Sequence, residues 1–205
     1  MLMVVDQTNR AAYIRLLDEM HRHRKAVFVD RLGWNLPVSG DHEFDAYDGA
    51  GALYLLSMDG ERLLSSARLL PTTEPHLMSE YFPHLCPGGV PRGPSVWEAS
   101  RFCVDPELGR RTVRRRELGR IIAGILEVGL DAGIAQVSFV ASSALLPLAL
   151  NAGWAARAIG PTLHDGQDAV TAVIADVTAE GFAAVCTRYG LARTVSALAP
   201  AEAVA

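Results

Sequence analysis

The sequence predicts an α/β fold, a three-layer α-β-α sandwich built on a mixed sheet. Strand-like and helical hydrophobic patterns alternate along the chain: strand, helix, three strands, then helix, strand, helix and two strands before a last helix. Asp59-Gly60 separates two apolar runs, which is a strong signal for an antiparallel hairpin. The 205 residues suffice for one domain spanning 1–205, with a sizeable core and a tail, 199–205, that is expected to fray.

The first half of the chain supplies a strand, a helix and a hairpin. Met1–Val5 is short and apolar, as expected for a strand, and helical spacing of apolar residues predicts a helix over Asn9–Phe28 with a polar cap at its start. A long ordered loop, Val29–Gly51, follows because Gly, Pro and Asp interrupt the periodicity. The hairpin strands are Leu53–Met58 and Leu63–Leu70.

The second half begins with another long loop, Pro71–Pro94, which contains six prolines and one expected helical turn at Leu77–Phe82. The elements expected after it are the strand Val96–Val104, the helix Thr112–Ala132, the strand Gln136–Ala141, the helix Ser143–Ala152, the strands Ala155–Ile159 and Ala169–Asp176, and the helix Ala179–Tyr189. Two long loops in a compact domain indicate function.

The strand Val96–Val104 is the most informative segment, because it carries a carboxylate, a hydroxyl and a guanidinium among apolar residues. Burying an unpaired charge is costly, so such groups need partners or a chemical role. Regular alternation places Glu98, Ser100 and Phe102 on one face of the strand. The opposite face then carries Trp97, Ala99, Arg101 and Cys103. We therefore expect this strand to line a site.

Charge and cysteine content narrow the function classes. The net charge of −4 argues against binding of nucleic acid. Cys86, Cys103 and Cys186 are widely spaced, which favours a reducing cytoplasm over a disulfide framework, and the histidine spacing predicts no metal site. The amino-terminal residues read as neither a signal peptide nor a membrane span, so no membrane partner is expected.

Positive charge is concentrated in one segment, where six arginines fall between Arg110 and Arg120 with Glu117 as the only acid. The run begins past a strand end and crosses a loop into a helix, so backbone N–H groups and side-chain cations could meet a phosphate. The alternative is a solvated helix face. We expect the run to dock a phosphate or an acidic protein.

The first long loop combines aromatic and acidic residues. Phe28 and Trp34 provide aromatic faces that attract an organic cation, and Asp45 and Asp48 provide carboxylates that neutralise it. Arg68 lies in an apolar strand and needs a carboxylate, either from the protein or from a ligand. The alternative is that Trp34 anchors the loop and the acids are solvated.

Rare residue types recur in register over the region from about Arg24 to Trp154: Arg24-(x3)-Phe28-(x5)-Trp34-(x10)-Asp45-(x2)-Asp48, then Ser66–Thr72, Phe82-Pro83 and Trp97–Phe102. Together they resemble the acyl-homoserine-lactone synthase (autoinducer synthase) family. The resemblance implies a fold similar to GNAT-type N-acyltransferases. It also implies synthesis of a quorum-sensing signal from S-adenosylmethionine and a fatty acyl thioester, carried on acyl carrier protein or coenzyme A. The amine forms an amide, and the methionyl carboxylate then displaces methylthioadenosine to close the lactone.

The resemblance also implies roles for individual residues. The S-adenosylmethionine wall comprises Arg24, Phe28, Trp34, Asp45, Asp48 and Arg68. Arg68 is either held by the loop acids or paired with the substrate carboxylate. Glu98 is the expected general base, directly or through water, and needs burial or a water chain to act on an ammonium group. Ser100 and Arg101 complete the catalytic group by positioning the acyl chain and phosphopantetheine, and the backbone N–H near Phe102 serves the oxyanion.

The acyl donor has its own implied contacts. The acyl and pantetheine groups are expected on Phe82, Arg101, Phe102, Phe139, Val140, Ser142 and Leu146. The donor's carrier is expected to dock on Arg110, Arg111, Arg114 and Arg115. For the segment 136–150, ordinary core packing is the alternative. Family members with a preference for 3-oxo chains carry Thr near the end of this strand, whereas Ala141-Ser142-Ser143 here favours an unsubstituted or unusual acyl group. The implied chemistry uses no metal and no cofactor, since S-adenosylmethionine is a substrate.

Two rival functions are another enzyme and a non-catalytic binding protein. A general GNAT-type acyl-coenzyme A N-acyltransferase acting on another amine needs a Gly-x-Gly/Ala turn before the helix, but the segment 107–112 contains only Gly109. A non-catalytic binder of carrier protein or ligand needs neither Glu98 nor the loop aromatics. The synthase explains all of these features and is the favoured function.

Overall fold

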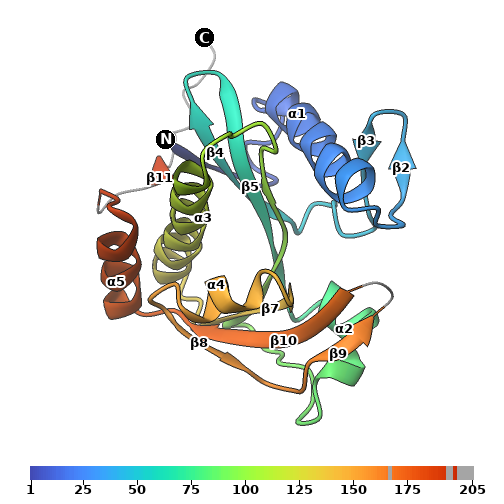
Figure 1. Ribbon diagram of the computed structural model, residues 1–205, viewed down its shortest axis with the longest axis vertical. Helices are drawn as coiled ribbons and strands as arrows, with labels where there is room; N and C mark the ends of the chain where they lie inside the picture. Colours follow the sequence, from blue (N-terminus) through green and yellow to red (C-terminus); the bar gives the residue numbers. More distant parts are fainter. Residues whose placement is uncertain (166–167, 193–195, 198–205) are drawn as a thin grey trace.

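The computed structural model describes residues 1–165, 168–192 and 196–197. The tail expected to fray, 199–205, lies outside the described residues. Within the described part of the chain, no helix has the length and apolar character needed to cross a membrane. The described elements form a large twisted sheet with helices on both of its faces (Figure 1).

The described strands of the sheet run in the order β11-β1-β4-β5-β6-β7-β10-β8, and β9 pairs with β10 (Figure 1). They are β1 (Leu2–Val5), β4 (Leu53–Asp59), β5 (Arg62–Pro71), β6 (Val96–Val104), β7 (Gln136–Ser142), β8 (Ala155–Ala158), β9 (Leu163–Asp165), β10 (Asp168–Asp176) and β11 (Ser196–Ala197). A separate small sheet consists of β2 (Val38–Ser39) and β3 (His42–Glu43). The β1–β11 and β6–β7 pairs are parallel and the other pairs are antiparallel, which confirms the predicted mixed sheet and its hairpin.

Two long helices, α3 (Arg111–Asp131) and α5 (Ala179–Tyr189), lie on one face of the sheet, and α1 (Ile14–Arg24) lies on the other (Figure 1). The shorter helices are α2 (Leu77–Glu80), α4 (Leu146–Leu150), a π-helix at Lys25–Arg31 and a 3-10 turn at Pro83–Leu85. This arrangement confirms the three-layer α-β-α sandwich.

Separate cores hold the layers together. Under α3, Ile121 and Leu126 pack with strand residues that include Leu69. Under α1, Leu17 and Met20 pack against the β4–β5 hairpin. Burial of such apolar side chains contributes about 1.5–3 kcal/mol each.

Close packing of α3 on the sheet depends on a glycine. A Cβ atom on Gly124 would meet Cδ2 of Leu2 at 2.0 Å, so a larger residue would require the Leu2 side chain or the helix to move. The absence of a side chain at Gly124 therefore lets α3 pack closely on β1.

The prediction for the first helix was wrong at both ends. α1 begins at Ile14 rather than Asn9, and the chain continues past Phe28 as a π-helix to Arg31. The Asn9 side chain does not cap the helix, because it accepts a hydrogen bond from the Asp6 N–H at 2.9 Å and donates to the Val4 carbonyl at 3.0 Å. Asn9 thus closes the end of β1, which explains why this polar residue precedes the helix without starting it.

Other boundaries differ less. The helix predicted over Ser143–Ala152 is confined to Leu146–Leu150, because its first residues form turns beyond the end of β7. The strand Leu163–Asp165 was missed, since it is short and pairs only with the start of β10. The predicted bounds Val96–Val104 and Ala179–Tyr189 match β6 and α5.

A β-bulge in β6 overturns the predicted alternation of its side chains. Arg68 pairs with Ser100, but Ser66 pairs with Cys103, so β6 has one residue more than β5 across this stretch. Arg101 takes φ of +52°, the one positive value for a non-glycine among the described residues. Ser100 and Arg101 therefore project toward the same face, and beyond the bulge Cys103 takes the position on that face predicted for Phe102. Phe102 packs into the core under α3 instead.

The sheet opens between β6 and β7. Their parallel ladder covers only 96–98 of β6 and 136–138 of β7, although both strands continue beyond it. Past Glu98, β6 therefore has no strand partner on this side within the described chain. This split places the bulge of β6 at a free inner edge of the sheet, where backbone N–H groups are available to a ligand.

Candidate active site

The α1 side of the sheet contains a closed ring of alternating charges. Arg24 comes from α1, Arg68 from β5 and Arg101 from the bulge of β6, and three carboxylates come from the segment 43–48. The order around this charge ring is Arg24, Asp48, Arg68, Asp45, Arg101, Glu43 and back to Arg24. Three positive charges therefore balance three negative ones, and each group contacts both of its neighbours.

In two arginines of the charge ring, every guanidinium nitrogen has a partner. Arg24 places Nη1 and Nη2 at 2.7 and 2.9 Å from the two oxygens of Asp48, and Nε at 2.5 Å from Oε2 of Glu43. Arg68 places Nη1 and Nη2 at 2.5 and 2.8 Å from the oxygens of Asp45, and Nη1 also lies 2.9 Å from Asp48. Such forked contacts are the strong form of the ion pair. Of the two predicted states of Arg68, the structure shows the one held by the loop acids.

Arg101 differs from the other two arginines. Its Nη2 lies 3.0 Å from Oε1 of Glu43 and 2.9 Å from Oδ2 of Asp45, and its Nε also donates to Glu43. Its Nη1 has no partner among the described residues. The Arg101 and Asp45 side chains are 8 % and 9 % exposed, whereas the other ring members are at most 5 % exposed. A ligand can therefore reach the charge ring at the Arg101–Asp45 edge.

The buried end of the charge ring stays ionised. Burial alone would raise the pKa of Asp48, but hydrogen bonds and charge from Arg24, together with the charge of Arg68, lower that pKa below its usual range. Asp48 and Glu43 in turn raise the pKa of Arg24 despite its burial. The Tyr54 hydroxyl also donates a hydrogen bond to Asp48, at 2.9 Å.

Two aromatic rings adjoin the exposed edge. Phe28 and Trp34 stack with centroids 5.0 Å apart and an interplanar angle of 14°. Cζ of Arg101 lies 5.8 Å from the centroid of Phe28. Phe28 is buried and Trp34 is half-buried, so Trp34 offers the more accessible face. The structure thus brings together every residue predicted for the S-adenosylmethionine wall: Arg24, Phe28, Trp34, Asp45, Asp48 and Arg68.

Glu98 lies on the same face of β6 and pairs with no guanidinium group in the described chain. Its Oε1 accepts the Met78 N–H at 2.6 Å and its Oε2 accepts the Leu77 N–H at 2.9 Å, at the start of α2. The side chain is 1 % exposed. Burial raises the pKa of Glu98 to about 7, even though the two N–H bonds and the more distant Arg68 and Arg101 favour the ionised form. Near neutral pH this carboxyl can therefore take up or release a proton.

Ser100 contacts the charge ring from β6. Its Oγ accepts a hydrogen bond from Nε of Arg68 at 3.1 Å. Glu98 and Ser100 are two residues apart on one strand, so their side chains face the same side of the sheet. The general-base candidate and the charge ring therefore lie on one face of the sheet.

The residues predicted to contact the acyl group do not share one wall. Phe139 stacks on Trp154 with centroids 5.5 Å apart and belongs to the core under α3, as do Phe102 and Leu146. Val140 faces the other side, where it packs in the small core that also contains Phe82. Ser142 follows Val140 by two residues and shares its face. The structure therefore separates these positions into two groups, one on each side of the sheet.

A cavity of about 400 Å3 opens between the end of β6, α3 and α4. Its apolar lining consists of Phe102, Val104, Leu118, Leu145 and Leu148, and its polar lining of Arg111, Thr112, Arg114 and Arg115. An acyl group on a phosphate-containing carrier has an apolar chain beside negative charge, and the lining of this cavity complements both.

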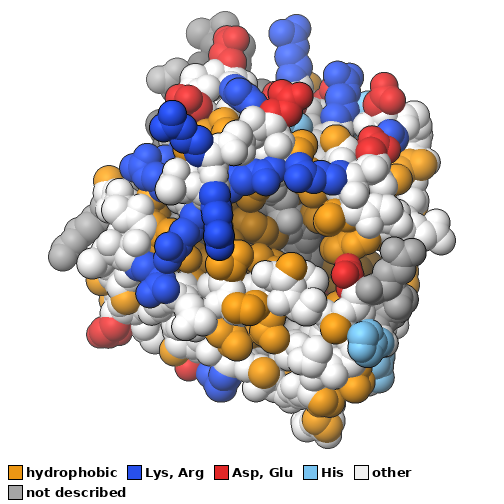
Figure 2. Space-filling model, in the orientation of Figure 1, with side chains coloured by type: hydrophobic (Ala, Val, Ile, Leu, Met, Phe, Trp, Pro, Cys, Tyr) orange, Lys and Arg blue, Asp and Glu red, His pale blue; other side chains and the backbone are white. Residues whose placement is uncertain are grey.

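The four arginines predicted to dock the donor's carrier are not paired with carboxylates in the described chain. Arg114 donates to the Pro106 carbonyl at 2.9 Å and leaves its buried Nε without a partner, and Arg115 lies over the ring of Tyr189. Arg110 and Arg111 are exposed at the start of α3. Figure 2 shows Lys and Arg side chains gathered in a band on this face of the molecule, beside a hollow in its surface.

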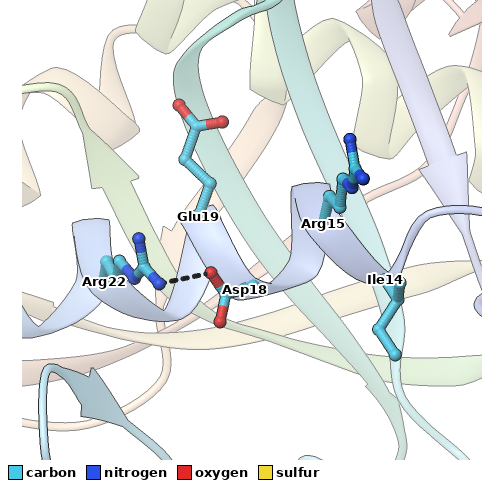
Figure 3. A pocket seen from close by; sticks show the side chains of 5 residues that line it. All are labelled: Ile14, Arg15, Asp18, Glu19 and Arg22. Carbon is cyan, nitrogen blue, oxygen red and sulfur yellow. Dashed lines mark ion pairs between the residues drawn. The ribbon is translucent and has the colours of Figure 1, made fainter.

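A second hollow lies on the outer side of α1 and is unrelated to this chemistry. It measures about 550 Å3 and is lined by Ile14, Arg15, Asp18, Glu19 and Arg22 (Figure 3). Asp18 and Arg22 pair across one turn of the helix at 2.9 Å, and both are well exposed. The buried side chains of α1, Arg24 among them, face the opposite way. We assign the hollow no role.

Sequence reasoning missed Glu43, although this residue closes the charge ring. Glu43 is fully buried in the structure, and it was not among the residues predicted for the site. A signal was present, because Glu43, Asp45 and Asp48 place three acids in six residues, while Arg24 and Arg101 had no predicted carboxylate partner in the protein. Arg101 itself was predicted on the wrong face, since the bulge cannot be read from alternation.

Known proteins share both the sequence and the architecture of this chain. The family model described as "Autoinducer synthase" matches residues 8–185. The isovaleryl-homoserine lactone synthase of Bradyrhizobium diazoefficiens is 35 % identical over 181 residues, which cover 85 % of this chain and 79 % of that protein. The structure of the coenzyme A-dependent acyl-homoserine lactone synthase BjaI, with S-adenosylmethionine and isopentyl-coenzyme A, matches with a TM-score of 0.88 at 30 % identity, covering 96 % of this chain and 92 % of that one.

A more distant structure shares the fold alone. A Lactobacillus plantarum protein described as an N-acetyltransferase has a TM-score of 0.56 at 14 % identity and covers 86 % of this chain and 99 % of its own. The expected similarity to GNAT-type folds is thereby confirmed. The family match spans α1, the charge ring, the bulged strand and the split sheet, and on this evidence the chain belongs to the autoinducer synthase family.

Proposed function

We propose that this protein makes an N-acyl-L-homoserine lactone from S-adenosylmethionine and an acyl thioester, with release of methylthioadenosine, as a quorum-sensing signal. The single observation that carries the proposal is the charge ring with Trp34 at its open edge and Glu98 on the same strand face. A sulfonium substrate with a free amine and carboxylate needs these three features together. The chemistry uses no metal or redox cofactor.

The open edge of the charge ring suits the methionyl end of S-adenosylmethionine. Nη1 of Arg101 has no partner in the described part of the chain and can donate to the substrate carboxylate, while the accessible face of Trp34, backed by Phe28, attracts the sulfonium. Every guanidinium nitrogen of Arg24 and Arg68 already has a partner in the protein, so these two arginines hold this edge rather than contact the substrate.

Glu98 is the general base of this proposal. With a pKa raised to about 7 by burial, it is matched to an ammonium group near neutral pH. It takes one proton from the substrate ammonium, directly or through a water. The neutral amine attacks the thioester carbonyl carbon, the tetrahedral intermediate expels the thiolate, and the second amine proton goes to that thiolate. Backbone N–H groups at the free edge of β6, near Phe102, stabilise the oxyanion.

Lactonisation follows on the same substrate. One carboxylate oxygen attacks the γ-carbon of the methionyl chain, and the carbon–sulfur bond breaks with its electron pair going to sulfur. Methylthioadenosine leaves as a neutral molecule. The protein contributes mainly by folding the substrate so that the carboxylate faces this carbon, since the sulfonium is already a good leaving group.

We propose acyl-coenzyme A as the donor. The Arg111, Arg114 and Arg115 side chains line an apolar cavity and have no carboxylate partners among the residues that the structure describes, which suits a phosphorylated carrier with an acyl chain. BjaI, described as coenzyme A-dependent, supports this choice over acyl carrier protein. The related isovaleryl-homoserine lactone synthase suggests a short, branched acyl group, in keeping with the Ala141-Ser142-Ser143 segment.

The proposal also extends to location. Cys86 and Cys103 are buried thiols, which supports the cytoplasm as the compartment.

Mass spectrometry of the purified protein with S-adenosylmethionine tests the function. Acyl donors are supplied in matched pairs, the same acyl group on coenzyme A and on acyl carrier protein. We expect an N-acyl-homoserine lactone with equimolar methylthioadenosine, formed faster from the coenzyme A donor. Acylation of another amine without methylthioadenosine would contradict the proposal and restore the general N-acyltransferase. Equal or faster use of the carrier protein would overturn the donor assignment alone.

A further inference from the structure

We infer that Glu43 is a positioning residue for the proposed reaction, and that it acts through Arg101 by closing the charge ring. The inference rests on the proposed function and adds a residue that does not itself reach the substrate. Its support comes from the contacts of Glu43, the backbone of Arg101 and the distribution of exposure around the ring.

Glu43 is anchored at its backbone as well as at its side chain. His21 on α1 donates a hydrogen bond to the carbonyl oxygen of Glu43 at 2.9 Å. Burial lowers the pKa of His21, which keeps its imidazole neutral. The neighbouring Phe44 ring contacts the His21 imidazole with centroids 3.9 Å apart and an interplanar angle of 35°. The carboxylate of Glu43 is thereby presented from a fixed segment, and it is fully buried.

The carboxylate spans two elements that no other ring acid connects. One oxygen accepts from Arg24 on α1, and Arg101 on β6 donates to the same group from Nε and Nη2. Asp48 contacts Arg24 and Arg68, and Asp45 contacts Arg68 and Arg101. Without Glu43 the ring opens into a chain whose two ends are Arg24 and Arg101.

Arg101 needs this restraint because its backbone conformation is unfavourable. A non-glycine residue with φ of +52° is held only where surrounding contacts determine it. Glu43 and Asp45 together occupy Nε and Nη2, which leaves Nη1 as the nitrogen that faces the open edge. Closure of the ring therefore sets where Nη1 points, and so where the carboxylate of S-adenosylmethionine binds.

Steady-state kinetics of the full chain with S-adenosylmethionine and its best acyl donor test the inference, with four variants: Glu43→Gln, Arg101→Gln, the double variant, and Glu117→Gln. We expect Glu43→Gln to raise the KM for S-adenosylmethionine about 10- to 100-fold and to change the KM for the acyl donor less than about 2-fold. In the Arg101→Gln background, Glu43→Gln should change the KM for S-adenosylmethionine less than about 2-fold.

Glu117→Gln is the matched control. Glu117 is 3 % exposed, pairs with Arg120 at 3.3 Å and accepts from Ser57 at 2.6 Å, but it lies under α3 on the other side of the sheet. Its loss should lower the Tm as Glu43→Gln does, with wild-type KM values. Should Glu43→Gln fail to fold, Glu43→Asp keeps the charge but shortens its reach, and it should still raise the KM for S-adenosylmethionine selectively.

Three results would overturn the inference: wild-type kinetics in a folded Glu43 variant, an equal rise in both KM values, or an effect of Glu43→Gln that is undiminished in the Arg101→Gln background. A wild-type protein that releases no methylthioadenosine would instead defeat the proposed function.

Discussion

Two buried acidic environments lie side by side on the α1 face of the sheet, and they differ in what compensates the charge. In the charge ring, Asp48 contacts two guanidinium groups, and its pKa falls below the usual range. Glu98 is similarly buried, but its partners among the described residues are two backbone N–H groups, and its pKa rises to about 7. Opposite pKa shifts in neighbouring carboxyls separate the acids that build a site from the one that exchanges protons in it.

The comparison extends to the arginines. The ring arginines have carboxylate partners and are buried, so they hold the site in shape. The arginines at the start of α3 have none in the described chain and line a cavity, so they are available to an anionic donor. A buried arginine that loses its partner is costly, whereas an exposed one costs little to keep unpaired.

The largest effect is expected for Glu98→Gln. The variant removes the proton acceptor and leaves the charge ring intact, so turnover should fall about 100- to 10,000-fold while binding of S-adenosylmethionine is retained. Stopped assays for methylthioadenosine and calorimetric titration with S-adenosylmethionine check the two parts. Turnover equal to wild type would remove Glu98 as the base.

The second effect is on stability, for Arg68→Met. This change leaves Asp45 and Asp48 buried with one partner fewer, so the free energy of unfolding should fall by about 3–5 kcal/mol. Urea unfolding followed by circular dichroism measures it. Arg111→Met is the comparison at an exposed arginine and should shift the same quantity by less than about 0.5 kcal/mol. Similar losses in both variants would mean that the ring is not the structural element described here.

The smallest effect is expected for Arg111→Glu. Reversal of one charge at the cavity should raise the KM for acyl-coenzyme A about 3- to 10-fold at low salt, with a smaller ratio at higher salt, because the contact is exposed to solvent. The KM for S-adenosylmethionine should not change. Arg15→Glu, on the outer hollow of α1, has the same change of charge and serves as the control. An equal effect of both variants would indicate that the net charge of the protein, rather than a docking site, determines the KM for acyl-coenzyme A.

Sequence reasoning identified most of the fold, because long periodic segments such as β6 and α5 can be recognised from their own residues alone. It also identified the aromatic pair and the acids Asp45 and Asp48, since unusual residues in a loop stand out. It named Arg101 as a site residue but placed its side chain on the wrong face of the strand, because a bulge is a property of the pairing between strands and leaves no trace in the alternation of one strand. It failed at Glu43, whose importance depends on two arginines from distant elements that meet only in the folded chain.

The pH dependence of kcat/KM for S-adenosylmethionine tests the central claim most directly, because it reports the ionisation of the free enzyme. Glu98 acts as a base only when deprotonated, so kcat/KM of the wild type should rise with pH through an apparent pKa of about 7. The residual activity of Glu98→Gln should lack this ascending limb. An ascending limb that persists unchanged in Glu98→Gln would show that another group is the base and would contradict the account.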